Sequence, residues 1–140
     1  MCPAGNTIND KRRPTVDIIM PVFNEAAVIA RQLTRLQGHT GVRTTIVVDG
    51  GSNDGTAEIV RALADDRVDP QGVLVRVVDA PRGRALQMNA GAARARADVL
   101  LFLHTDTYLP ADAIERVRDA VVEGAVWGRF DIRLDGTNVL

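Results

Sequence analysis

The chain has 140 residues, of which 46% are hydrophobic and 25% are charged, and its formal net charge is −1. This length suits one domain, and these proportions exclude a generally disordered chain. A net charge near zero gives no global basis for binding nucleic acid or an anionic membrane, so local groups must hold any bound anion. The single cysteine, Cys2, excludes a disulfide framework. We therefore expect a cytoplasmic location, which includes a peripheral position at the inner membrane face.

Residues 1–15 contain Pro, Gly, Asn and the basic run Lys11-Arg12-Arg13, without the apolar core of a signal peptide. We expect these residues to form a flexible tail ahead of one domain at 16–140. No apolar run approaches the roughly 18–20 residues that cross a bilayer, so we expect no transmembrane segment.

The remaining chain alternates between short apolar runs, typical of buried strands, and segments in which apolar residues recur at helical spacing. The expected elements are a strand at 16–22, a helix capped by Asn24 and ending near Gly38, a strand at 44–48, a helix from 56, a strand at 73–78, a helix at 85–95, a strand at 99–103, a helix with Pro110 in its first turn and a strand at 130–134. This order predicts an α/β fold with a mainly parallel sheet flanked by helices. The uninterrupted apolar strands indicate burial on both faces of the sheet.

Polar or glycine-rich residues follow four of these strands. The four clusters are Asn24 and Glu25 after Pro21, the segment 49–55, Arg82 with Arg84, and His104 with Thr105 and Asp106. Ligands of parallel sheets bind beyond the carboxyl ends of the strands, so we expect the clusters to line one crevice.

The clusters suit the parts of a nucleoside diphosphate. Asp49 can accept hydrogen bonds from a base or ribose, and Gly51 lets the backbone approach a flat ligand. Arg82 and Arg84 offer forked donors for phosphate oxygens. Asp106, together with His104, offers ligands for a divalent cation that would bridge two phosphates.

Each cluster alone also has an ordinary structural interpretation. The segment 49–55 suits a turn with a helix cap, the two arginines suit a solvated loop, and His104 with Asp106 is a weak metal signal. Their position at successive strand ends favours the functional interpretation. Dinucleotide-binding, P-loop and nucleophile-elbow motifs are absent from the sequence, which disfavours those classes.

Residues 19–25 (IMPVFNE) resemble the opening strand of family 2 glycosyltransferases, and residues 47–56 (VVDGGSNDGT) resemble that family's second-strand motif. Residues 83–92 and 101–107 resemble a bacterial subgroup that is associated with radical-SAM/selenodomain genes. The similarity runs from Val16 to the end of the chain.

The resemblance implies a GT-A fold, a nucleoside-diphosphate sugar donor, a divalent cation (Mn²⁺ or Mg²⁺) and inversion at the anomeric carbon. Carried over by position, the implied donor-site residues are Pro21, Asn24 and Glu25 in the nucleoside pocket, Asp49 at the base or ribose, Arg84 near the diphosphate, and Asp106 at the metal.

The sequence departs from the family's pattern at three places. Gly50 stands where a second Asp is common, and His104 replaces the first Asp of the Asp-x-Asp motif, although imidazole favours softer ions than Mg²⁺. Family members also continue beyond Leu140 with the acceptor pocket and the catalytic base. We therefore expect a C-terminally truncated chain with an incomplete sheet, exposed apolar surface and a tendency to form homo-oligomers.

The sequence thus predicts a metal-assisted glycosyltransferase that uses a nucleoside-diphosphate sugar and an acceptor hydroxyl of unidentified class, with its catalytic base outside this chain. The alternative is a truncated, inactive homologue that only binds nucleotide. A nucleotidyltransferase ranks last, because the loop after residues 16–22 contains neither Gly nor Lys.

Overall fold

The computed structural model describes residues 12–64 and 74–133. Its elements in chain order are β1 (Val16–Val22), α1 (Ile29–Leu36), β2 (Val42–Asp49), α2 (Thr56–Ala64), β3 (Leu74–Asp79), α3 (Arg84–Arg94), β4 (Val99–Phe102) and α4 (Ala113–Val122). The predicted alternation of strands and helices is confirmed from β1 to α4.

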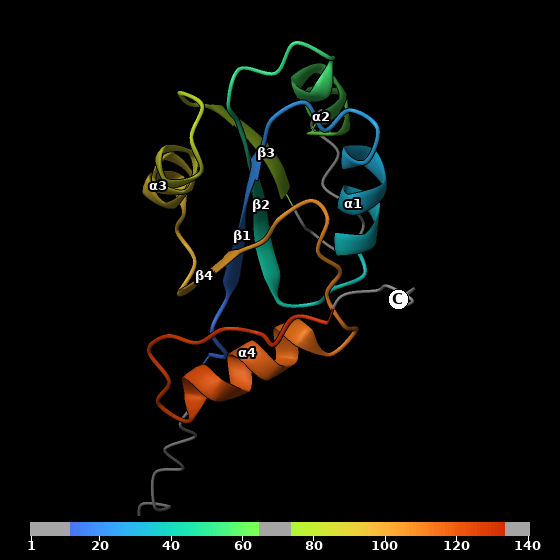
Figure 1. Cartoon of the computed structure of the whole chain (residues 1–140). Helices are drawn as coiled ribbons and strands as arrows, with labels where there is room; N and C mark the ends of the chain where they lie inside the picture. The colour runs from blue at the N-terminus through green and yellow to red at the C-terminus, as the bar shows by residue number, and fades with distance from the viewer. Residues whose placement is uncertain (1–11, 65–73, 134–140) are drawn as a thin grey trace, which may run out of the picture.

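The four strands form one parallel sheet in the order β3-β2-β1-β4. In its central rows, Ile19 of β1 pairs with Ile46 of β2 and with Phe102 of β4. The parallel α/β prediction is confirmed. Because all the strands run the same way, their carboxyl ends lie together at one edge (Figure 1).

Helices cover both faces of the sheet, with α1 and α2 on one side and α3 on the other (Figure 1). Successive residues of β1 therefore enter different cores. Ile18 and Met20 pack in a cluster with Leu33 of α1, whereas Ile19 packs with Ile46 and with Ala90 of α3. This two-sided burial explains why β1 is apolar without alternation.

Close packing of α3 and hydrogen bonds just beyond it hold this part of the chain against the sheet. Gly91 permits a close approach, because a Cβ atom there would lie 2.5 Å from Ile19 Cγ2. Beyond the helix, the fully buried carboxylate of Asp17 accepts hydrogen bonds from the backbone N–H groups of Arg96 (2.8 Å) and Ala97 (2.9 Å). These contacts fix the path of the chain from α3 into β4.

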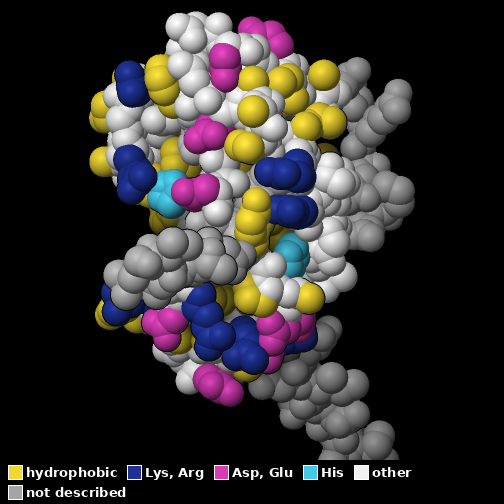
Figure 2. Space-filling view, turned by 45° about the vertical axis from the view of Figure 1, so that its right-hand side comes forward, with side chains coloured by type: hydrophobic (Ala, Val, Ile, Leu, Met, Phe, Trp, Pro, Cys, Tyr) yellow, Lys and Arg dark blue, Asp and Glu magenta, His cyan; other side chains and the backbone are white. Residues whose placement is uncertain are grey.

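Helix α4 lies near the amino-terminal end of β1 (Figure 1). Arg118 of α4 donates from Nε to the carbonyl oxygen of Pro14 at 2.9 Å, and Arg13 forms ion pairs with Glu115 and Asp119. Residues 12–15 of the predicted tail thus contact the domain, while residues 1–11 lie outside the described part. Basic and acidic side chains are intermixed over α4 in Figure 2.

Three local predictions are wrong. Asn24 does not cap α1, which begins at Ile29, because its own backbone turns at a φ of 51° and its side chain binds a neighbouring loop. Pro110 precedes α4 by a turn, since its carbonyl oxygen accepts from the N–H of Ala113 at 3.0 Å. The predicted burial of every strand on both faces is wrong for β4, where Phe102 is 47% exposed.

The predicted strand at 130–134 is also wrong over the residues that the structure describes. Residues 130–133 form no strand, and Ile132 is 76% exposed. An alternating apolar pattern yields a strand only where a sheet edge supplies backbone partners, and nothing in the described residues pairs with this segment. None of the described helices combines the length and apolar character that a membrane span requires.

Candidate functional site

The loops that follow β1 and β2 are joined by hydrogen bonds at the carboxyl edge of the sheet. The N–H of Asn24 donates to Ser52 Oγ at 2.8 Å, and Asn24 Oδ1 accepts from the N–H of Asn53 at 2.9 Å. One residue later, the N–H of Glu25 donates to Thr56 Oγ1 at 2.9 Å. The structure therefore brings two of the predicted clusters into one surface, next to the half-buried Pro21 near the end of β1.

Asp54 closes the second of these loops. Its carboxylate accepts from the hydroxyl and the N–H of Thr56 and, at 3.1 Å, from the N–H of Ala26. The hydrogen bond from the Thr56 hydroxyl, supported by those from the backbone, holds the pKa of Asp54 below its usual range. Asp54 is thereby engaged in shaping the loop.

Asp49 is the last residue of β2 and is only 4% exposed. One carboxylate oxygen, Oδ2, accepts from the N–H groups of Gly51 and Ser52, both at 3.0 Å. The other oxygen, Oδ1, is buried without a hydrogen-bond partner. Buried acceptors are normally satisfied, so this oxygen is suited to accept an N–H or O–H group of a ligand.

Gly51 takes a φ of +88°, and a side chain there would meet no atom within 4 Å. Glycine is favoured at this φ, and the open space leaves the backbone accessible to a ligand.

Gln87 of α3 holds the ends of β1 and β2 together, a role that the sequence analysis missed. Its buried side-chain Nε2 donates to the carbonyl oxygens of Val22 (2.8 Å) and Val48 (2.9 Å), and its Oε1 accepts from the N–H of Gly83 at 3.2 Å. A Cβ atom at Gly50 would lie 2.9 Å from this amide. The glycine that replaces the family's common second Asp thus makes room for Gln87.

The amino-terminal end of α3 supplies the positive charge expected near phosphates. Arg84 is the first residue of the helix and is exposed, and no side chain caps the helix. Arg82 lies over the ring of Phe23, with its Cζ 3.9 Å from the ring centroid. Free N–H groups at a helix start favour an anion, and the two arginines add to that preference.

His104 and Asp106 follow β4, which lies beside β1, and the N–H of Leu103 continues the strand pairing to Ile19 O at 3.0 Å. Asp106 is exposed and accepts from Thr107 Oγ1 at 3.3 Å. The described residues contain no group of three or more His, Cys, Asp or Glu side chains that could hold a metal ion. The donor set therefore fits a cation only if ligand phosphates complete the coordination, an arrangement that Mg²⁺ commonly adopts.

A second acidic residue at this edge, Asp79, was missed by the sequence analysis. It ends β3, pairs in register with Asp49, and forms an ion pair with Arg61 at 3.2 Å. The repeated Val-Val-Asp at 47–49 and 77–79 was the available signal. Among the described residues, no hydrogen bond or ion pair links Asp49 to Arg84 or to Asp106.

The chain is similar to known glycosyltransferases over most of its length. The family profile described as glycosyl transferase family 2 matches residues 17–139. An N-acetylglucosaminyltransferase of Rhizobium leguminosarum bv. trifolii is 30% identical over 140 residues, covering 91% of this chain and 72% of that protein. Other relatives are longer, and the chain spans 34% of one of them.

Two solved structures are similar to the chain. The mannosyltransferase PcManGT from Pyrobaculum calidifontis, in complex with GDP-Man and Mn²⁺, is 28% identical with a TM-score of 0.63, covering 79% of this chain and 32% of that one. The glucosyl-3-phosphoglycerate synthase from Mycobacterium tuberculosis, in complex with Mn²⁺, UDP and glucosyl-3-phosphoglycerate, is 25% identical with a TM-score of 0.55, covering 89% and 47%.

Proposed function

The chain belongs to glycosyl transferase family 2 and has the GT-A fold of its structural neighbours, and on this premise we propose that it forms the donor-binding part of a glycosyltransferase. The proposed reaction transfers a sugar from a nucleoside diphosphate to an acceptor hydroxyl, with inversion at the anomeric carbon. The observation that carries the proposal is the buried, unpartnered Oδ1 of Asp49 at the carboxyl edge of the sheet.

The nucleoside would lie against the joined loops after β1 and β2. Asp49 Oδ1 would accept a hydrogen bond from a base N–H or a ribose hydroxyl, since its partner oxygen is already occupied by two backbone N–H groups. The accessible backbone at Gly51 would pack against the flat base, with Pro21, Asn24 and Glu25 forming the adjoining wall.

The diphosphate would lie at the start of α3. Arg84 and the uncapped N–H groups of the helix would bind its oxygens, because both favour negative charge. As the sugar leaves, negative charge builds on the diphosphate, and preorganised donors of this kind stabilise that charge. The two neighbouring structures described above contain GDP-Man and UDP, which supports a nucleoside-diphosphate sugar as the ligand class.

Asp106 and His104 would hold Mn²⁺ or Mg²⁺ together with the phosphates. When bound, such an ion neutralises phosphate charge and orients the leaving group. The Mn²⁺ in two neighbouring structures supports this part of the proposal. The acceptor hydroxyl would attack in line with the departing diphosphate, and we assign its activation to no described residue.

We also propose that the chain belongs to the radical-SAM/selenodomain-associated subgroup, which residues 83–92 and 101–107 support. We further propose a cytoplasmic location. We also propose that the chain forms homo-oligomers. This proposal is supported by β4, whose outer edge has no strand neighbour among the described residues and whose Leu100 and Phe102 are exposed.

Titration of UDP or GDP into matched variants by calorimetry, with and without Mn²⁺, tests these assignments. We expect Arg84→Gln to weaken binding roughly tenfold, as loss of a charged hydrogen bond does, while Arg94→Gln at the far end of the same helix leaves affinity unchanged. Asp106→Ala should remove the dependence on Mn²⁺. Equal affinity in all three variants would overturn the proposal, whereas donor binding without sugar transfer would support the binding-only alternative.

A further inference from the structure

Three buried side-chain atoms in the described residues lack a hydrogen-bond partner, namely Asp49 Oδ1, Gln32 Oε1 and His39 Nδ1. The first lies in the proposed donor site. The other two line one pocket beside α1, formed by Gln32, Arg35, Leu36, Gly38, His39, Tyr108, Leu109 and Ala111. A buried polar atom without a hydrogen-bond partner lowers the stability of the folded state, so two of them around one cavity indicate that a ligand could supply the missing partners.

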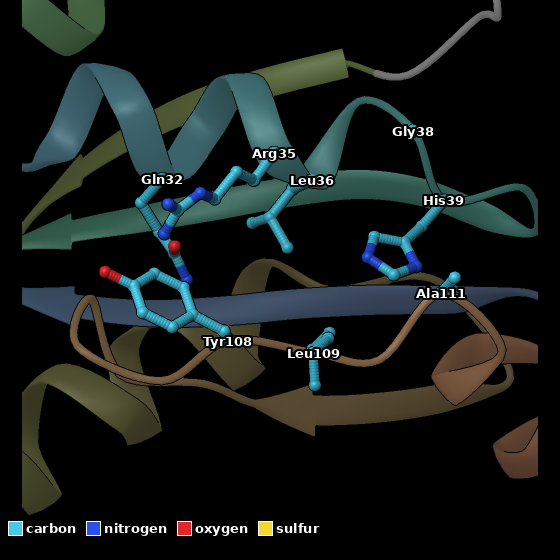
Figure 3. A pocket seen from close by; sticks show the side chains of 8 residues that line it. All are labelled: Gln32, Arg35, Leu36, Gly38, His39, Tyr108, Leu109 and Ala111. Carbon is cyan, nitrogen blue, oxygen red and sulfur yellow. The ribbon is translucent and has the colours of Figure 1, made fainter. Parts of the chain in front are cut away.

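The pocket has a volume of about 490 Å³, and none of its lining residues belongs to the proposed donor site. Figure 3 shows Gln32, Arg35 and Tyr108 at one end, His39 at the other, and Leu36 and Leu109 between them. Gln32 lies within α1, whereas His39 lies in the loop beyond Leu36, the last residue of that helix. The cavity is thus elongated, with polar ends and apolar middle walls.

At the Tyr108 end of the pocket, the free polar groups are an acceptor on Gln32 and the positive charge of Arg35. Gln32 Nε2 donates to the carbonyl oxygen of Thr107 at 2.7 Å, so its amide oxygen is the group left free, and that oxygen can only accept. Arg35 lies over the ring of Tyr108, with its Cζ 3.9 Å from the centroid. Among the described residues Arg35 forms no ion pair with a carboxylate. A ligand at this end would therefore need an anionic group beside a hydroxyl.

The other end requires a second polar group. His39 is only 9% exposed, and its Nδ1 has no hydrogen-bond partner. This nitrogen can donate a hydrogen bond to a ligand hydroxyl or accept one from it. Between the ends, Leu36 and Leu109 would pack against C–H groups. Gln32 Oε1 and His39 Nδ1 are buried, so ligand binding would also require a small rotation of the side chains that line the pocket. The exposed side chain of Arg35 can rotate in this way.

We propose that this pocket is a second ligand site, for a hydroxylated organic anion of about the size of a sugar phosphate. The phosphate or carboxylate binds Arg35, one hydroxyl donates to Gln32 Oε1, and another pairs with His39 Nδ1. The proposal is independent of the donor site, since it involves other residues and no nucleotide.

Backbone amide NMR on the full 140-residue chain tests this site, with glucose 6-phosphate as the probe and glucose and inorganic phosphate as its two separate halves. We expect glucose 6-phosphate to bind saturably and to shift the amide signals of Gly38 and Tyr108. Glucose and phosphate should each bind at least tenfold more weakly, because each satisfies only part of the pocket. UDP should instead shift the signals of Gly51 and Ser52, which separates failure of this proposal from failure of the donor site.

Two variants complete the test. Arg35→Gln should weaken glucose 6-phosphate binding roughly tenfold, whereas the matched exposed Arg31→Gln on the same helix should have no effect. His39→Leu should weaken binding yet raise the melting temperature of the free protein, since it removes a buried unpartnered atom. The proposal is overturned by unshifted Gly38 and Tyr108 signals, by equal affinity in Arg35→Gln, or by probe shifts confined to Gly51 and Ser52.

Discussion

The contact between Gly50 and Gln87 makes a sharp prediction about how the donor site is built. A methyl group at position 50 would lie 2.9 Å from the side-chain amide of Gln87, a distance that forces the amide to move. The moved amide would leave the carbonyl oxygens of Val22 and Val48, which it now binds at 2.8 and 2.9 Å. We therefore expect Gly50→Ala to break both bonds.

The cost can be worked from these two bonds. A buried hydrogen bond contributes about 1 kcal/mol net, and leaving its partner unsatisfied adds to that, so we expect Gly50→Ala to lower the free energy of unfolding by about 2–4 kcal/mol. For a chain of this size the melting temperature should fall by roughly 6–15 °C. The matched control is Gly38→Ala, where the nearest contact is 3.7 Å away and the change should stay within about 0.5 kcal/mol.

A double-mutant cycle distinguishes the specific contact between positions 50 and 87 from a general loss of packing. Gln87→Ala removes the amide, so Gly50→Ala added to it should cost less than about 1 kcal/mol. The coupling between the two positions should be about 2 kcal/mol, measured by urea unfolding followed by circular dichroism. Additive effects, within about 0.5 kcal/mol, would refute the reasoning.

Two further predictions concern packing and pH. Gly91→Ala places a methyl group 2.5 Å from Ile19 Cγ2 and 2.9 Å from Val48 Cγ2, so urea unfolding should show a loss of about 1–3 kcal/mol, and a loss below about 0.5 kcal/mol would contradict the close approach of α3. The Thr56 hydroxyl and backbone N–H groups hold the pKa of Asp54 below its unfolded value of about 3.9, so the stabilisation by its carboxylate is complete above that value and is lost as the pH falls through the folded pKa. The stability difference between the native chain and Asp54→Asn should therefore shrink on acidification from pH 6 to pH 3, and a difference that stays constant with pH would be inconsistent with this assignment.

The strands of the sheet centre could be predicted because they are buried on both faces. The run 16–22 is apolar apart from Asp17, and glycine-rich or proline-containing segments mark where the strands end. The same rule failed at β4, because Leu100 and Phe102 face outward and no helix of the described part of the chain covers them. The sequence of a strand does not reveal whether a neighbouring element covers it.

Candidate-site residues could be proposed from the sequence where their position depends on backbone geometry, and they were missed where it depends on tertiary contacts. Asp49 could be found from its place after a strand and before Gly50 and Gly51. Asn24 was misassigned because a helix cap and a loop-bridging amide use the same residue type. Gln87 gave no signal, since a glutamine on a helix is usually exposed, and only the fold places it against Val22 and Val48.

The most direct test of the donor site is calorimetric titration of UDP, GDP and dTDP into the folded 140-residue chain, each with and without Mn²⁺. We predict that one of these nucleotides binds and that Mn²⁺ strengthens its binding by an order of magnitude or more. If a chain shown to be folded by circular dichroism binds none of the three, with or without Mn²⁺, the assignment of a nucleoside-diphosphate sugar site to this sheet edge is contradicted.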